Sequence, residues 1–138
     1  MRIKSLPILS LMLISLAHGQ GTAGSNKVEL GEEFTIRNGQ EVVVRGEKIR
    51  VTFRSVTQDS RCPRGVVCAW AGNGEVLIEV ARKNKKQVVA MLNTMLDPKE
   101  IVYRGFKIRL VGLSPYPKAN QPIDPKDYEA TLIVTKED

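Results

Sequence analysis

The stretch "KIRVTFRSV", from Lys48 to Val56, decides the fold class of this chain. Apolar and polar residues alternate in it, so that one face would carry Ile49, Val51 and Phe53 and the other Lys48, Arg50, Thr52 and Arg54. This alternation is typical of a β-strand that buries one face and exposes the other. The same pattern returns in "FKIRL" (106–110) and in "YEATLIV" (128–134).

The residues between the alternating stretches are turn formers. Asn38-Gly39 predicts a tight hairpin, and Gly46-Glu47 and "KNKK" (83–86) can close two more. Asp97-Pro98 predicts a further turn, and four prolines within 114–127 predict a long surface connection before the last strand. The expected fold is therefore all-β: a mainly antiparallel β-sandwich or small barrel of seven to eight strands with one short-range disulfide.

The N-terminus has the layout of a secretory signal. Arg2 and Lys4 precede an apolar run from Leu6 to Ala17, which is too short to span a bilayer comfortably. A retained membrane anchor is the less favoured alternative. We expect a cleavable signal peptide over 1–19, a flexible lead-in over 20–27 and a single β-domain over 28–138. The mature chain would be secreted or periplasmic after cleavage near Gly19, without an integral membrane segment.

The segment "DSRCPRGVVCAWAG" (59–72) holds both cysteines and the only tryptophan. In an oxidising compartment the simplest reading of two cysteines is a disulfide between Cys62 and Cys68. Its short ring would fix the shape of one loop rather than tie distant strands together.

The other residues of this segment suggest how the loop is arranged. "CPRG" (62–65) matches a type I turn. Arg61 and Arg64 are expected to project outward, because arginine is rarely buried without a partner. Trp70 is expected to pack on the disulfide and the sheet, because a lone tryptophan usually buries a large apolar surface.

The sequence excludes several kinds of catalytic chemistry. The only histidine, His18, lies in the expected signal, so the mature chain lacks imidazole-dependent triads and the usual zinc sites. Glycine-rich nucleotide motifs are also missing, and no pair of acidic residues stands out by its spacing. We therefore predict that the protein is not an enzyme and has neither a metal nor a cofactor.

Basic residues offer candidate binding positions. Arg50 and Arg54 share the outward face of one expected strand, and Lys107 and Arg109 share that of another. If the two strands were neighbours, they would form a basic stripe suited to anionic glycans, lipid headgroups or acidic proteins. The plainer interpretation is a solvated face whose charges prevent edge pairing. Loss of Arg2 and Lys4 with the signal would lower the net charge from +6 to +4, and no aromatic residues interleave these positions, so nucleic acid is not an expected partner.

Two groups of residues resemble the signatures of an uncharacterised family of short exported bacterial β-proteins. The central signature is matched by Asp59, Ser60, Arg61, Cys62, Pro63, Cys68, Trp70, Ala71 and Gly72, and the closing one by Pro115, Pro117, Tyr128, Ala130, Thr131, Leu132 and Val134. The resemblance spans nearly the whole mature chain and implies a β-fold and export. Many members of that family look lipid-anchored, whereas this chain has no cysteine before Cys62 that could carry a lipid.

Three functions remain as hypotheses. The first is an exported, non-enzymatic binding or structural module of the cell envelope, whose partner would be an envelope protein or an anionic glycan. It would bind through the clamped loop and the basic residues, with the candidates Arg61, Arg64, Trp70, Arg50, Arg54, Lys107 and Arg109. The second is a protease inhibitor that presents Arg61 or Arg64 on a preorganised loop. The third is a thiol–disulfide sensor that uses Cys62 and Cys68.

Overall fold

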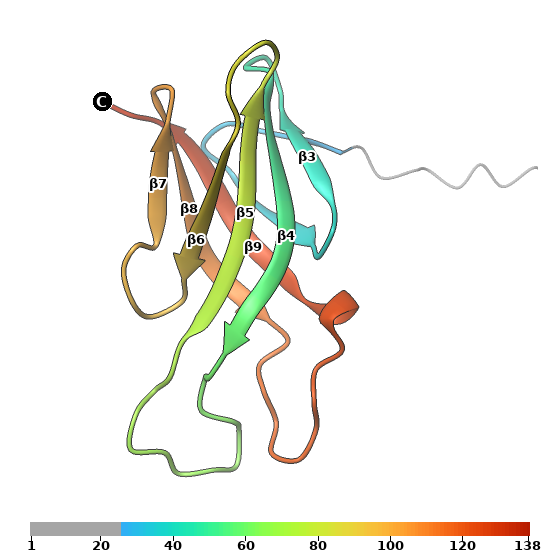
Figure 1. The fold of residues 1–138 in the computed structure, drawn as a ribbon, viewed down its shortest axis with the longest axis vertical. Helices are drawn as coiled ribbons and strands as arrows, with labels where there is room; N and C mark the ends of the chain where they lie inside the picture. Colours follow the sequence, from blue (N-terminus) through green and yellow to red (C-terminus); the bar gives the residue numbers. More distant parts are fainter. Residues whose placement is uncertain (1–25) are drawn as a thin grey trace, which may run out of the picture.

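The computed structural model describes residues 26–138, which form two β-sheets packed against each other (Figure 1). This range contains nine strands and one short 3-10 helix: β1 (Lys27–Val28), β2 (Glu33–Arg37), β3 (Glu41–Val44), β4 (Ile49–Asp59), β5 (Gly74–Arg82), β6 (Val88–Asn93), β7 (Glu100–Tyr103), β8 (Phe106–Ser114), η1 (Pro125–Asp127) and β9 (Glu129–Lys136). The all-β class is confirmed. The count exceeds the predicted seven to eight because two-residue β1 is too short to show an alternation.

The strands are divided between the sheets as in a β-sandwich. One sheet has the order β1-β3-β4-β5-β6 and the other the order β2-β9-β8-β7. All neighbours are antiparallel except β1 and β3, which pair in parallel. The predicted signal peptide (1–19) and most of the predicted lead-in lie outside the described residues, and β1 begins at Lys27.

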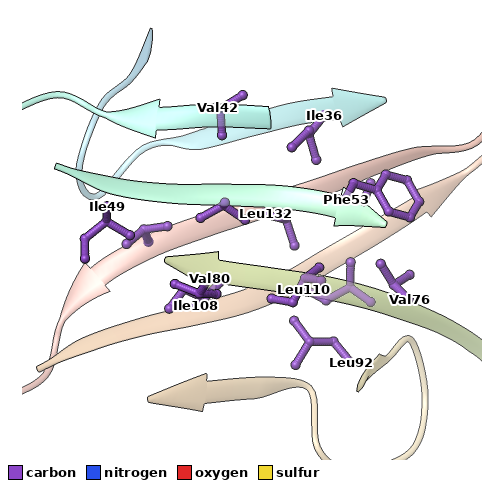
Figure 2. Packing of buried hydrophobic residues seen from close by; sticks show 14 of the residues in the cluster. Ile36, Val42, Ile49, Phe53, Val76, Val80, Leu92, Ile108, Leu110 and Leu132 are labelled. Atoms are coloured by element: carbon purple, nitrogen blue, oxygen red, sulfur yellow. The ribbon is translucent and has the colours of Figure 1, made fainter. Parts of the chain in front are cut away.

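The alternating residues of the sequence form the core. Ile49, Val51 and Phe53 of β4 are fully buried and belong to one core cluster with Ile108 and Leu132 of the opposite sheet. Figure 2 shows labelled members of this cluster, among them Ile49 and Phe53. Arg50, which lies between Ile49 and Val51, and Arg54, which follows Phe53, are exposed. Burying large aliphatic and aromatic side chains contributes roughly 1.5–3 kcal/mol each, and this core is the main source of stability for the fold.

The predicted hairpin at Asn38-Gly39 is wrong, although a turn does form there. Gln40 N donates to Arg37 O at 2.9 Å, which closes the turn, but β2 before it pairs with β9 and β3 after it pairs with β4. The turn therefore carries the chain from one sheet to the other. In contrast, the turns at 45–48 and 83–87 do connect the paired strands β3–β4 and β5–β6, as predicted.

Long loops gather at one end of the sandwich. The β4–β5 connection (60–73) and the β8–β9 connection (115–128) both project from the lower end in Figure 1. The proline-rich surface connection predicted between the last two strands is thus confirmed. Two register shifts in the β4–β5 pair, after Phe53 and after Val56, lie along the way from the sheet to this end. Bulges of this kind bend a strand pair and change the direction in which the chain leaves the sheet.

Candidate functional site

The site that the sequence singled out is the β4–β5 loop, and the structure confirms its disulfide. Cys62 and Cys68 are bonded, with their Cα atoms 5.9 Å apart. The tight turn inside the ring is one residue later than predicted: Val66 N donates to Pro63 O at 3.2 Å, and Gly65 has a φ of 84°. A positive φ at the third position is the mark of a type II rather than a type I turn.

Arg61 does not project outward as predicted; it is buried, with 6% of its surface exposed. Its guanidinium is bidentate on Asp59, through Nε to Oδ1 at 2.8 Å and Nη2 to Oδ2 at 2.7 Å. The same guanidinium donates to Leu113 O at 2.6 Å and to Pro115 O at 2.9 Å. Arginine can be buried here because a carboxylate neutralises it and its donors reach acceptors.

These contacts make Arg61 the link between the two long loops. Asp59 ends β4, whereas Leu113 and Pro115 lie at the end of β8, more than fifty residues further along the chain. Arg64 N adds a backbone bond to Pro117 O at 2.9 Å. The β4–β5 loop is thus held in place from its root outward.

Tyr128 completes this buried polar group by donating its hydroxyl to Asp59 Oδ2 at 2.8 Å. Burial alone would raise the pKa of the Asp59 carboxyl, but hydrogen bonds from Arg61 and Tyr128 outweigh it and hold the pKa below the ordinary value. Burial, together with the hydrogen bond to the carboxylate, raises the pKa of Tyr128 to about 12. Both groups therefore keep one protonation state across the neutral range.

A second polar centre, Asn73, fixes the β6–β7 loop beside the disulfide loop. Its Oδ1 accepts from Met95 N at 3.0 Å and from Leu96 N at 3.3 Å, and its Nδ2 donates to Asn93 Oδ1 at 2.8 Å. Asn73 and Asn93 are both buried. These contacts hold the β6–β7 loop in a fixed place next to the β4–β5 loop.

Gly72 lets the returning chain pass close to the outgoing chain. Its φ is 73°, and a Cβ at this position would overlap the carbonyl of Ser60 and lie 2.8 Å from Arg61 Cα. The residues on either side of it make the flanking bonds, from Cys62 N to Ala71 O at 3.0 Å and from Ser60 N to Asn73 O at 2.8 Å. Only glycine fits this crossing of the two chain segments.

Trp70 is exposed, which contradicts the prediction that it packs on the disulfide and the sheet. Its exposed fraction is 83%, and Val67, in the disulfide ring, is fully exposed at 101%. The core is already closed by the two sheets, and the anchoring is done by Arg61 instead. The apolar side chains of the loop are left facing solvent.

Met95 and Leu96 continue this apolar surface from the neighbouring loop. They are 52% and 59% exposed, and with Trp70 and the disulfide they line an open groove of about 550 Å³. No charged side chain lines this groove. Neither residue was predicted from the sequence, although an apolar pair directly before the Asp97-Pro98 turn was a usable sign of exposure.

Arg64 does project outward, as predicted, and its guanidinium lies 5.5 Å from the centre of the Tyr116 ring. Arg61 approaches the same ring at 5.0 Å. Lys118, which is also exposed, forms a backbone bridge with Arg64. Tyr116 and Lys118 were not predicted as site residues, because only the fold brings the β8–β9 loop beside the disulfide.

The predicted basic stripe does not form. Arg50 and Arg54 lie on β4 and Lys107 and Arg109 on β8, and these strands belong to different sheets. Three of the four face an acidic side chain: Arg50 pairs with Glu41, Arg54 with Glu79 and Lys107 with Glu100. Lys48 lies in the β3–β4 turn rather than on the strand. These residues are spread over solvated faces and do not add to the loop end.

Residues 26–138 contain no cluster of three or more metal-ligating side chains. In the same range, no helix has the length and apolar character needed to cross a membrane.

Comparisons with protein-family models, with curated proteins and with solved structures find no match to this chain. The resemblance to a family of exported β-proteins therefore stays an expectation from its two sequence signatures.

Proposed function

We propose that this protein is an exported, non-enzymatic binding domain whose recognition surface is the loop end of the sandwich. The observation that carries the proposal is Trp70, exposed on a loop that is fixed at its root by Arg61 and across its middle by the Cys62–Cys68 disulfide. Holding an apolar loop in one shape before binding lowers the ordering cost of association. An exposed tryptophan is a frequent anchor of recognition surfaces.

Export is supported by the N-terminal pattern and by the disulfide, which persists in oxidising compartments. The binding partner would be a component of the cell envelope. It would contact the exposed apolar side chains of the loop end rather than the basic residues on the faces of the sheets. Arg50, Arg54 and Lys107 are engaged by acidic neighbours, which removes most of the support for an anionic glycan on those faces.

A binding role is better supported than a catalytic one. General acid–base catalysis works best with groups whose pKa lies near the operating pH. Here the pKa of Asp59 is lowered and that of Tyr128 is raised, so both move away from neutrality. The groove beside Trp70 has no charged side chain in its lining that could act instead.

The protease-inhibitor hypothesis loses half of its basis. Arg61 is buried and bonded to Asp59, so Arg64 is the remaining candidate for a trypsin-like pocket. Arg64 and Gly65 occupy the centre of the tight turn closed by Val66 N and Pro63 O, not the extended conformation that a protease cleft binds. A titration against trypsin-like proteases separates the inhibitor hypothesis from the proposed binding domain: inhibition at stoichiometric ratio would favour the inhibitor.

The sensor hypothesis also has less support than a structural disulfide. A redox-active cysteine is usually poised by a nearby cation that lowers its thiol pKa. Arg61, the nearest arginine in sequence, has its guanidinium committed to Asp59, Leu113 O and Pro115 O.

Photo-crosslinking in living cells tests the proposed function without assuming the class of partner. A photoreactive phenylalanine derivative replaces Val67 in the full-length chain, and the same residue replaces Val102 on β7 as the matched control, since Val102 is 49% exposed and lies outside the loop end. We expect a specific adduct at Val67 and none at Val102. Equal or absent crosslinking at both positions would refute the loop end as the recognition surface.

A further inference from the structure

Three large apolar side chains of the disulfide loop are exposed. Val66, Val67 and Trp70 are 44%, 101% and 83% exposed. They belong to the β4–β5 loop that projects beyond the sheets in Figure 1. With Met95 and Leu96 on the adjoining loop, they form what we call the apolar tip, and large exposed apolar groups on a fixed surface commonly mark interaction sites.

On the disulfide loop and on the adjacent part of the β8–β9 loop, the charges have one sign once the internal pair is set aside. Exposed acids lie further off in sequence, with Asp97 next to Leu96 in the β6–β7 loop and Asp124 and Asp127 at the end of the β8–β9 loop. In segments 60–73 and 114–123 the charged side chains are Arg61, Arg64 and Lys118, and neither segment contains Asp or Glu. Arg61 is neutralised by Asp59 in the interior. Arg64 and Lys118 are therefore two exposed cations next to the apolar tip, on adjacent stretches of backbone.

We propose that the apolar tip inserts into the interfacial region of an anionic lipid membrane, with Arg64 and Lys118 on the headgroups. This inference rests on the proposed function, since it names the partner of the same surface. Tryptophan prefers the membrane interface because its ring is apolar and its N–H is polar, and basic side chains extend their charge to the headgroups. Anionic lipids attract each basic residue near their surface.

A protein partner fits this surface less well than a lipid surface does. A stable protein interface buries about 800 Å² on each side and depends on matched shapes. The apolar tip is a projecting loop with few side chains, whereas a membrane deforms around whatever enters it. The buried contacts of Arg61 and Asn73 stop the loop from folding back onto the sandwich, so its apolar side chains stay available.

The opposite end of the sandwich provides the comparison that tests this assignment. The β5–β6 turn carries Lys83, Lys85 and Lys86, and the exposed apolar residues that follow it, Val88 and Val89, belong to β6 rather than to the turn. Attraction by charge alone would bring that end to an anionic surface. Insertion by the apolar tip would bring the end that carries Trp70.

Because Trp70 is the only tryptophan, its emission reports which end meets the lipid. The full chain is expressed with its own N-terminus, and the form that the cell exports is mixed with vesicles of phosphatidylcholine or of an equimolar mixture with phosphatidylglycerol. We expect a blue shift and quenching by brominated lipid with the anionic vesicles, and a much weaker response with the neutral ones.

Matched variants test how much each group contributes to partition into the anionic vesicles. Val67→Asp should reduce partition at least about tenfold because it replaces an inserted apolar group with a charge, whereas Val102→Asp should leave it unchanged. Arg64→Gln with Lys118→Gln should lower partition about 30-fold, from about 1 kcal/mol for each basic residue. Lys85→Gln with Lys86→Gln should change it less than about twofold, since that end lies beyond the screening length.

Three results would overturn the lipid assignment. The first is no emission change with anionic vesicles, and the second is an equal effect of Val67→Asp and Val102→Asp on partition. The third is an equal effect on partition of the Arg64/Lys118 double variant and the Lys85/Lys86 double variant. A protein or glycan adduct at Val67 in cells, or a self-associated form that Val67→Asp disperses, would likewise overturn it while leaving the proposed recognition surface in place. No adduct of any kind at Val67 would refute the proposed function itself. Circular dichroism of each variant establishes that it is folded.

Discussion

Replacing Arg61 with methionine removes the buried side-chain contact that joins the two long loops. Methionine has a similar reach but cannot donate, so Asp59 loses its bidentate partner, and Leu113 O and Pro115 O lose their donor. The side chains of Arg61 and Asp59 are only 5% and 9% exposed, so water does not readily replace these bonds. Breaking a buried ion pair by removing one partner costs about 3–5 kcal/mol, and this is the expected loss in free energy of unfolding.

For a domain of this size, that loss corresponds to a fall in Tm of more than about 10 °C. Urea unfolding followed by circular dichroism measures the free energy directly. Arg64→Met is the matched control, because Arg64 lies in the same loop but is exposed and its side chain contacts the Tyr116 ring. Its expected cost is at most about 1 kcal/mol.

The pH dependence gives this prediction a second readout. In the folded wild type the pKa of Asp59 lies below its ordinary value of 3.8, so its contribution is present above that pH and is lost as the pH falls through the folded pKa. In Arg61→Met, burial acts on Asp59 without the opposing guanidinium and raises its pKa. As the pH falls, protonation of Asp59 removes the cost of burying an unpaired carboxylate in the variant. The stability difference between the two proteins should therefore narrow in acid.

The anchoring role of Arg61 is refuted if Arg61→Met is no less stable than Arg64→Met at neutral pH. It is also refuted if the stability difference from wild type is independent of pH. Either result would mean that the buried pair does not hold the two loops together.

Gly72→Ala should destabilise by at least about 2 kcal/mol more than Gly65→Ala in urea unfolding: both glycines have a positive φ, but only at Gly72 does a Cβ meet backbone. Equal losses would refute the close crossing. Asn73→Ala should speed amide exchange at Met95 and Leu96 by removing their acceptor, while core amides of β4 stay protected; unchanged exchange at the two amides would contradict this role. Tyr128→Phe should weaken the loss of stability at alkaline pH. A folded pKa of about 12 for Tyr128 means that stability falls as the unfolded phenol ionises above pH 10. An unchanged alkaline profile would show that Tyr128 is not the responsible group.

Local alternation was sufficient to predict an all-β sandwich or small barrel, but neither the choice between the two nor the topology. The period of two identifies the buried faces of β4, β8 and β9, since burial on one face is a property of each strand alone. Asn38-Gly39 marks the limit of such local information. The dipeptide determines that the chain turns, whereas the sheet that the next strand joins depends on pairings with β4 and β9.

The candidate site shows the same division between local and distant information. The disulfide follows from composition and compartment, and Asp59 and Arg61, two residues apart on an extended chain, share one side, so their pairing was open to prediction. The carbonyls that complete the Arg61 site come from the end of β8 and could not be foreseen. Because these distant contacts anchor the loop, Trp70 is not needed as an anchor and stays exposed, against the usual preference of its residue type.

The most direct test of an exposed recognition loop is acrylamide quenching of Trp70 in the free protein. The chain has one tryptophan, so the signal has a single source. An exposed fraction of 83% predicts emission typical of tryptophan in water, with quenching close to that of a free tryptophan analogue. Protected, blue-shifted emission in the free protein would place Trp70 against the sandwich and contradict an exposed recognition loop.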